Sequence, residues 1–235
     1  MADPDISSPI PSRIVPRRRI TGMSAVLLPH TRGGEIDWAA TEAHIARTHD
    51  AGLVPGVNMD TGYVQLLDAP TTLRVLDLAR DVTGGEFAAG AFVADASGDP
   101  RDLPAYVAAA TDISERGGLP VVFPSHGLNE GTEGEWIDAL AAIGRKVDRF
   151  LGFELGPMFV PYGRIYSLDA YEGLLGIPQC IGAKHSSLSR VAEWDRLRIR
   201  DRIRPDFRVL TGNLSLIHIS EPTRRNQSSR MPSSA

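Results

Sequence analysis

The chain lacks several features that define whole classes of protein. Among its 235 residues is a single cysteine, Cys180, which excludes a disulfide framework and a cysteine-rich zinc site. No apolar run approaches the roughly 18 residues of a membrane span, and the first twenty residues carry no apolar signal-peptide core. The formal net charge is −4, without the basic excess of nucleic-acid-binding proteins. We therefore expect a soluble, cytoplasmic protein that binds neither nucleic acid nor membrane.

Lysine is also scarce. Of the 25 Lys and Arg residues only Lys146 and Lys184 are lysines. Arginine stays protonated in proteins, whereas a lysine amine can be held neutral and can therefore act as a nucleophile. The two lysines of so arginine-rich a chain are thus candidates for chemistry that arginine cannot perform.

Short apolar segments alternate with segments of helical period, once every ~30 residues. The expected strands are Met23–Pro29, Leu53–Asn58, Phe87–Val93, Leu119–Pro124, Phe150–Leu155, Cys180–Ala183 and Phe207–Leu210. The expected helices include Trp38–Arg47, Leu73–Arg80, Leu103–Arg116, Glu135–Val147, Leu168–Leu175 and Val191–Arg202. This alternation predicts an α/β fold, a (β/α)8 TIM barrel that is truncated at its C-terminus, with about seven strands present. A doubly wound sheet is the alternative, although no strand is followed by a dinucleotide- or phosphate-binding glycine motif.

The two ends of the chain differ from this pattern. Residues 1–21 are rich in proline, serine and arginine, and we expect a flexible leader there. Leu214–Arg224 reads LSLIHISEPTR and Ser229–Ala235 reads SRMPSSA, and both strings resemble the translation of a transposase-type sequencing adapter. We therefore expect a barrel domain over residues 22–213 and a non-native, adapter-encoded tail over residues 214–235.

Lys184 stands where a parallel barrel places its active site, at the carboxyl end of a strand. It follows the apolar Ile181–Ala183 and precedes polar residues. Burial among apolar groups disfavours the ammonium form, which would leave the amine free to attack a ketone and form a Schiff base. The alternative is a surface lysine or one that binds an anion.

Another strand end carries Asp60-Thr61-Gly62, a tight turn with a hydroxyl and backbone N–H groups that suit a carboxylate. A simple turn with no ligand is the alternative interpretation.

Candidate acid–base and metal-binding groups occupy further strand ends. His126 and His185 are candidate general bases, and Tyr162 and Tyr166, just past the fifth strand, are candidate proton relays. Structural hydrogen bonding or packing is the alternative for each of them. A metal site would draw on strand-end carboxylates and imidazoles, namely His30, Asp95, His126 and Glu154, but their spacing specifies no geometry.

Four segments occur in an order and spacing that resemble a known family. They are GMSAVLLPHTRGGEIDW (Gly22–Trp38), GVNMDTGYVQLL (Gly56–Leu67), IGAKHSS (Ile181–Ser187) and VLTGN (Val209–Asn213). The chain resembles the dihydrodipicolinate synthase/N-acetylneuraminate lyase family of class I aldolase-type barrels. The resemblance implies that Lys184 forms an imine with pyruvate or another 2-oxo acid, with no metal or organic cofactor. It also implies that Thr61 and Gly62 bind the keto-acid carboxylate, and that the full-length protein is a homo-oligomer.

The chain departs from the family pattern at three places. Asp60 stands where the family has the first hydroxyl residue of its turn. The family tyrosine after the fifth strand would align with Gly156 or Met158, and neither is a tyrosine. Ser125-His126 replaces an aromatic pair after the fourth strand.

These departures predict a Schiff-base lyase or aldolase that acts on a 2-oxo acid but is not dihydrodipicolinate synthase itself. His126, Tyr162 or Tyr166 would supply the acid–base function, and Asp60 would favour a less anionic or hydroxyl-bearing substrate. One alternative is a non-catalytic barrel that binds a small ligand. Another is a metal-dependent barrel hydrolase or aldolase built on Asp95, His126 and Glu154.

Overall fold

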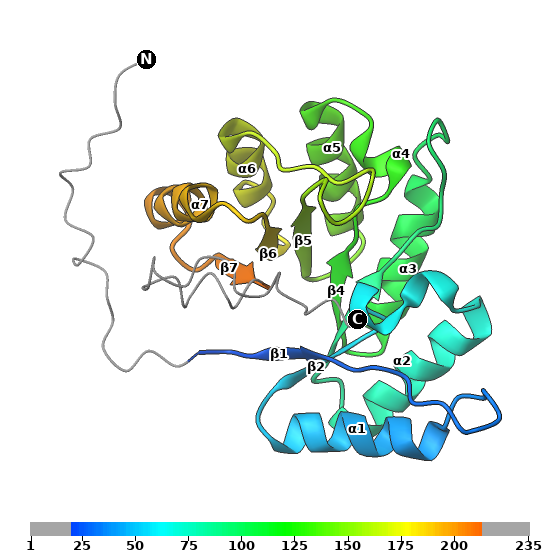
Figure 1. Cartoon of the computed structure of the whole chain (residues 1–235). Helices are drawn as coiled ribbons and strands as arrows, with labels where there is room; N and C mark the ends of the chain where they lie inside the picture. The colour runs from blue at the N-terminus through cyan, green and yellow to red at the C-terminus, as the bar shows by residue number, and fades with distance from the viewer. Residues whose placement is uncertain (1–19, 213–235) are drawn as a thin grey trace, which may run out of the picture.

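A computed structural model describes residues 20–212, which form one curled, parallel sheet covered by helices (Figure 1). The seven strands follow one another across the sheet in chain order, and every neighbouring pair is parallel. They are β1 (Met23–Ala25), β2 (Val54–Val57), β3 (Ala88–Ala91), β4 (Leu119–Val122), β5 (Phe150–Leu155), β6 (Cys180–Ser186) and β7 (Arg208–Thr211). The seven predicted strands are thereby confirmed.

The strand order decides between the two predicted fold types. A doubly wound sheet reverses its strand order, whereas this sheet runs from β1 to β7 without a reversal. The TIM-barrel-like α/β fold is therefore confirmed, as seven strands of a curled sheet. Within residues 20–212, β1 and β7 are the two edges of the sheet and do not pair with each other. Residues 1–19 of the predicted leader, which spans residues 1–21, and the predicted tail over residues 214–235 lie outside the described residues.

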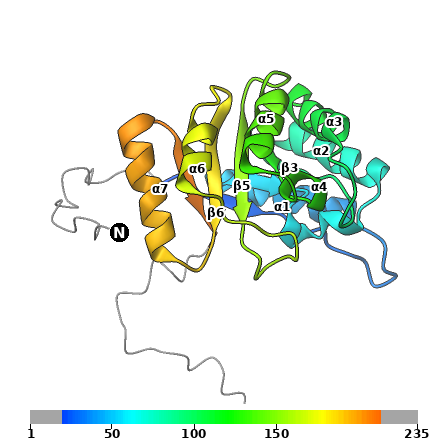
Figure 2. The same ribbon diagram turned by 90° about the horizontal axis from the view of Figure 1, so that it is seen from above.

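The main helices lie on the outer side of the sheet (Figure 2). They are α1 (Trp38–Asp50), α2 (Ala69–Thr83), α3 (Leu103–Glu115), α5 (Glu133–Gly144), α6 (Leu168–Leu175) and α7 (Arg190–Ile203). The 3-10 turn η2 (Asp60–Gly62) coincides with the predicted tight turn, whereas the short α4 (His126–Asn129) and a second 3-10 turn, η3 (Val64–Leu66), were not predicted. No helix among the described residues is long and apolar enough to cross a membrane.

Local sequence explains where the helices begin. Asp37, Asp68 and Asp102 each accept a hydrogen bond from a backbone N–H in the first turn of α1, α2 and α3. Thr132 and Glu135 form a reciprocal capping box at the start of α5. These side chains satisfy amide groups that have no partner inside the helix, which stabilises each start by about 1 kcal/mol.

The sheet separates two hydrophobic cores. The outer core, between the sheet and the helices, contains large side chains such as Trp136, Tyr106 and Ile45. The inner core lies on the other face of the strands and includes Phe123 and Phe153. Because successive strand residues point to opposite faces, each strand supplies both cores. A residue at a strand end can therefore reach the barrel interior only if its side chain lies on the inner face of the sheet.

Candidate active site

Lys184 is a half-buried lysine on the inner face of β6. It pairs in register with Phe153 of β5, and its Nζ lies 4.3 Å from the centroid of the Phe153 ring. Burial lowers the pKa of Lys184, and the nearby Asp60 carboxylate only partly offsets this effect. A larger share of this amine is therefore neutral, and able to act as a nucleophile, than for a lysine in water.

The Phe153 ring and the backbone after β7 both lie close to the lysine side chain. Phe153 itself packs edge-to-face against Phe123, with the ring centroids 5.3 Å apart. After β7 the backbone passes close by: a Cβ atom at Gly212 would lie only 3.1 Å from Cε of Lys184. Glycine at this position therefore leaves room for the lysine side chain. The enclosure explains why desolvation dominates the pKa of Lys184.

Asp60 is an acidic residue whose charge acts on both Lys184 and Tyr162. It opens the 3-10 turn η2 at the carboxyl end of β2. Its charge raises the pKa of Lys184, and it also contributes to raising the pKa of Tyr162, after burial and Asp95. Asp60 thus lies within electrostatic reach of both Lys184 and Tyr162, at the end of the sheet where the sequence predicts chemistry.

His126 packs against Tyr162, with the ring centroids 4.7 Å apart. Nδ1 of His126 lies 3.0 Å from Oε1 of Glu130, which orients the imidazole. Asp95 accepts hydrogen bonds of 2.8 Å from the backbone N–H groups of His126 and Gly127, so it anchors the start of α4. Four of the predicted site residues are therefore connected in series: Asp60 acts on Lys184 and on Tyr162, and Tyr162 contacts His126.

The predicted carboxylate-binding turn, Asp60–Gly62, is only partly free to bind a ligand. The Gly62 amide donates a 2.9 Å hydrogen bond to the Met59 carbonyl within the turn, so it is already used in this conformation. A Cβ at Gly62 would lie 3.1 Å from the Val26 carbonyl oxygen, which explains the glycine. Thr61 is exposed and lies beside Asp60. A role in carboxylate binding remains a prediction, with Thr61 better placed for it than the Gly62 amide.

Tyr166 requires a correction. It lies in the outer core, stacks on Trp136 at 3.7 Å and donates a 2.5 Å hydrogen bond to Oδ1 of Asn129. Burial raises the pKa of its hydroxyl far above the ordinary value. The structure does not bring Tyr166 to the inner face where Lys184 lies, because the chain turns outward after β5. Of the two predicted tyrosines, Tyr162 is the one that shares the electrostatic influence of Asp60 with the lysine.

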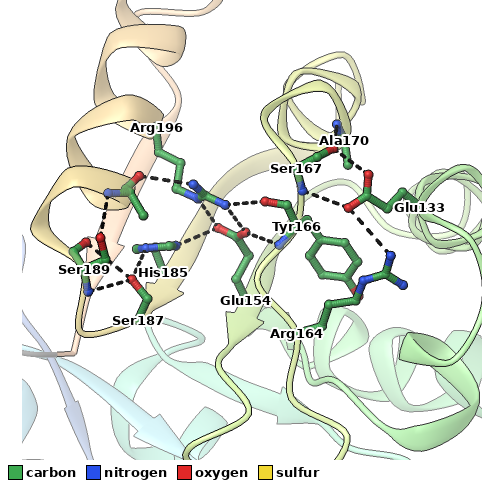
Figure 3. Close-up of polar contacts among 11 residues, drawn as sticks. Glu133, Glu154, Arg164, Tyr166, Ser167, Ala170, His185, Ser187, Ser189 and Arg196 are labelled. Carbon is green, nitrogen blue, oxygen red and sulfur yellow. Dashed lines mark hydrogen bonds and ion pairs between the residues drawn. The ribbon is translucent and has the colours of Figure 1, made fainter. Parts of the chain in front are cut away.

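His185 and Glu154 are also turned away from Lys184, because each follows an inner-face residue in its strand. Their side chains are 1% and 0% exposed, and Nδ1 of His185 lies 2.9 Å from Oε2 of Glu154. Arg196 of α7, 2% exposed, donates to both carboxylate oxygens, from Nε at 2.7 Å and from Nη2 at 2.6 Å (Figure 3). His185 is therefore not placed to act as a general base on a substrate held at Lys184.

The metal alternative is not supported by the arrangement of side chains. It requires Glu154 to meet Asp95 and His126, but Glu154 is committed to Arg196 and His185 in the outer core. Within residues 20–212, no three His, Cys, Asp or Glu side chains are grouped in a way that could hold a metal ion.

The electrostatic coupling of Asp60 to Lys184 leads to a pH prediction. Burial lowers the pKa of Lys184 and Asp60 raises it, so Asp60→Asn should lower this pKa further. The neutral amine then persists to lower pH, and the rate of imine formation with pyruvate should reach half its maximum at a lower pH than in the parent. Rates of borohydride-trapped adduct measured across pH would show the shift. Asp138→Asn, an exposed carboxylate on α5, is the matched control, and an upward shift in Asp60→Asn would contradict the assignment.

The fold and the site together define the class: a TIM-barrel-like α/β protein with a desolvated lysine at the carboxyl end of its sixth strand. Solved structures with this fold include a monomeric dihydrodipicolinate synthase variant, with 14% sequence identity and a TM-score of 0.68 over 83% of this chain and 63% of that one. Dihydrodipicolinate synthase from Aquifex aeolicus has 19% identity and a TM-score of 0.64 over 83% and 64% of the two chains. A 2-keto-3-deoxygluconate aldolase variant from Sulfolobus solfataricus has 16% identity and a TM-score of 0.62 over 84% and 62%.

These similarities confirm the predicted resemblance at the level of the fold. No family model matches the sequence, and no curated protein matches it. The chain spans slightly less than two thirds of the length of the solved structures named above.

Proposed function

We propose that this chain is a Schiff-base-forming lyase of the class I aldolase type that acts on a 2-oxo acid such as pyruvate, with a substrate other than that of dihydrodipicolinate synthase. One observation carries the proposal: Lys184 projects into the inner core beside Phe153, where burial lowers its pKa. The similarity of the fold to synthases and aldolases supports the same activity. We also propose a cytoplasmic location and, for the full-length protein, a homo-oligomer.

The proposed chemistry begins with the neutral amine of Lys184. Its lone pair attacks the ketone carbon of the 2-oxo acid, and the resulting carbinolamine loses water to give a protonated imine. The positive nitrogen then accepts the electron pair of a bond at the adjacent carbon, either C–H or C–C. Breaking a C–C bond releases an aldehyde and leaves an enamine, which is protonated and hydrolysed back to the amine and the 2-oxo acid. Each proton that moves requires a donor or acceptor near the imine.

Tyr162 is the group we propose for these proton transfers. Burial, Asp95 and Asp60 all raise the pKa of its hydroxyl, so it is protonated at neutral pH and enters as a proton donor. His126 packs on the ring and supplies a second titratable group next to it. This pair would replace the tyrosine that the family pattern has at Gly156 or Met158.

The negative charge of Asp60 restricts which substrates can bind. An anionic carboxylate near the amine repels a second negative charge and accepts a hydrogen bond from a hydroxyl group. We propose that the portion of the substrate facing Asp60 is uncharged and carries a hydroxyl, with the exposed Thr61 contributing to carboxylate recognition.

Borohydride trapping tests the proposal. Incubation with pyruvate and a panel of 2-oxo acids, followed by reduction and intact mass, should give a covalent adduct of one reduced acid per chain. The adduct should disappear in Lys184→Arg and persist in Lys146→Arg, which removes the only other lysine and lies on the surface. If no acid labels the folded chain, or if the label survives in Lys184→Arg, the lyase proposal fails and a ligand-binding barrel becomes the better explanation.

A further inference from the structure

Three side chains on the opposite side of the sheet from Lys184 form a relay, that is, a series of two hydrogen bonds. Oε2 of Glu154 lies 2.9 Å from Nδ1 of His185, and Nε2 of His185 lies 2.7 Å from Oγ of Ser187 (Figure 3). Glu154 comes from β5, His185 from β6, and Ser187 directly follows β6. The relay therefore bridges two neighbouring strands and opens towards the start of α7.

The contacts assign a role to each atom of the imidazole. Ionised Glu154 can only accept a hydrogen bond, so Nδ1 of His185 carries the proton and donates it to the carboxylate. Nε2 then has its lone pair facing Oγ of Ser187. A hydroxyl next to a base that a third group orients is the geometry by which serine is activated as a nucleophile on many unrelated folds.

The carboxylate of this relay is held rigidly. Arg196 donates to both of its oxygens, and the backbone N–H of Tyr166 donates to Oε1 at 3.1 Å. Although burial alone would raise the pKa of Glu154, the hydrogen bonds from Arg196 and His185 outweigh it and lower the pKa. Glu154 thus stays ionised and fixes the orientation of His185.

The surroundings of Ser187 indicate what could reach it. Glu154 and His185 are buried, whereas Ser187 is half-buried and lies beside Ser189, which caps α7. Three exposed apolar side chains, Leu188, Val191 and Trp194, follow at intervals of three residues. Val191 and Trp194 lie on one face of α7 because they are three residues apart in the helix, and Leu188 lies just before the helix, next to the serine. Together these three side chains form an apolar strip. The positive end of the α7 dipole lies at the same place and favours an oxyanion.

We propose that Ser187 is a nucleophilic serine, activated by His185 and Glu154, that takes the acyl group of an ester with an apolar acyl chain. Oγ of Ser187 bonds to the acyl carbon while its proton passes to Nε2 of His185. The C–O bond to the leaving group breaks, and the leaving alkoxide takes that proton from His185. Water, deprotonated by the same imidazole, then releases the carboxylic acid and restores the serine. This centre is independent of Lys184 and of the lyase chemistry.

Covalent labelling tests the proposal directly. Diisopropyl fluorophosphate should add one phosphoryl group to the full chain, and peptide mapping should place it on Ser187. Ser187→Ala should abolish the label, and His185→Gln should slow labelling about 100-fold or more, because the base is lost. Ser97→Ala, at an exposed serine in a distant loop, is the control and should leave the labelling rate unchanged.

Hydrolysis of p-nitrophenyl esters tests whether the apolar strip of Leu188, Val191 and Trp194 binds the acyl chain. The butyrate ester should be hydrolysed faster than the acetate ester, and Trp194→Ala should remove that preference. Circular dichroism of each variant establishes that it is folded, since His185 is buried. The proposal is overturned if the folded parent takes no label, if the label maps to another serine, or if Ser187→Ala is labelled as fast as the parent. Imine trapping at Lys184, measured in parallel, reports separately on the lyase proposal.

Discussion

Replacement of Glu154 by alanine is expected to lower the free energy of unfolding by about 3–5 kcal/mol, since one partner of a buried ion pair is removed and the other stays behind. Arg196 is 2% exposed and donates to both Glu154 oxygens, so its guanidinium would remain buried without its counter-charge. His185 and the backbone N–H of Tyr166 would each lose an acceptor as well. Urea unfolding monitored by circular dichroism would measure the loss.

Two comparisons separate this explanation from a general sensitivity to mutation. Glu154→Leu combined with Arg196→Met removes both charges and should restore much of the stability, because no unpaired buried charge remains. Asp81→Ala breaks the exposed pair between Asp81 and Arg80 and should cost less than about 1 kcal/mol. A change of less than about 1 kcal/mol for Glu154→Ala would contradict the role assigned to this network.

The same carboxylate gives stability a defined pH dependence. The pKa of Glu154 in the folded protein is below its ordinary value of 4.5, so folding favours the ionised form. Its contribution is therefore fully present above that ordinary value and is lost as the pH falls through the lower, folded pKa. The acid limb of the stability profile should be shallower in the variant with Glu154→Leu and Arg196→Met than in the parent.

Replacement of Tyr162 by phenylalanine is expected to slow proton transfer about 100- to 10,000-fold, the usual contribution of a general acid–base group. The readout is exchange of the pyruvate methyl protons with deuterium, followed by NMR, because this exchange requires proton transfer from the imine to form the enamine. Borohydride trapping should persist, since the Lys184 amine is unchanged. A large loss of exchange with trapping retained would therefore identify the tyrosine as a proton-transfer group.

Tyr63→Phe is the control for this experiment, because Tyr63 is an exposed tyrosine that directly follows the Asp60–Gly62 turn. Its exchange rate should equal that of the parent. If Tyr162→Phe exchanges at the parental rate, the proton-transfer role passes to His126, and His126→Gln becomes the variant to measure.

The sequence was sufficient to predict the sheet and the candidate catalytic residue, Lys184. Continuous apolar runs alternate with helical segments and predict buried parallel strands, and seven were found in chain order. Lys184 could be selected because lysine is rare in this chain and because it stands at a strand end. Both inferences depend only on local pattern, which a single sequence contains.

The faces of the residues near the strand ends could not be predicted in the same way. Tyr162 and Tyr166 follow the same strand and were equivalent candidates, yet the loop turns Tyr166 into the outer core beside Trp136. Only the alternation of side chains between the two faces of β6 could have been used to predict a face. His185 follows Lys184 directly and must therefore point to the other face. The partnership of Glu154 with Arg196 joins residues 42 positions apart and has no local signature.

Phe153 was missed because its importance depends on register. It meets Lys184 only because β5 and β6 pair with Phe153 opposite Lys184 and Glu154 opposite His185. An apolar residue in a strand gives no indication of which neighbour it will face. A tight turn at Asp60–Gly62 was predicted, but the internal hydrogen bond of the Gly62 amide follows from the 3-10 geometry of that turn, which the sequence did not predict.

The pairing of β5 with β6 constrains how this chain can vary over evolution. Lys184 and His185 are adjacent in sequence but serve opposite faces of the sheet, so deletion or insertion of one residue within β6 would exchange their positions. The amine would then enter the outer core against Arg196, and the imidazole would face the barrel interior. Substitutions can accumulate in β6 one at a time, but a one-residue change of length that shifts this register would remove both the lysine site and the contact between His185 and Glu154. Homologous sequences that keep this lysine should therefore align through β6 without gaps.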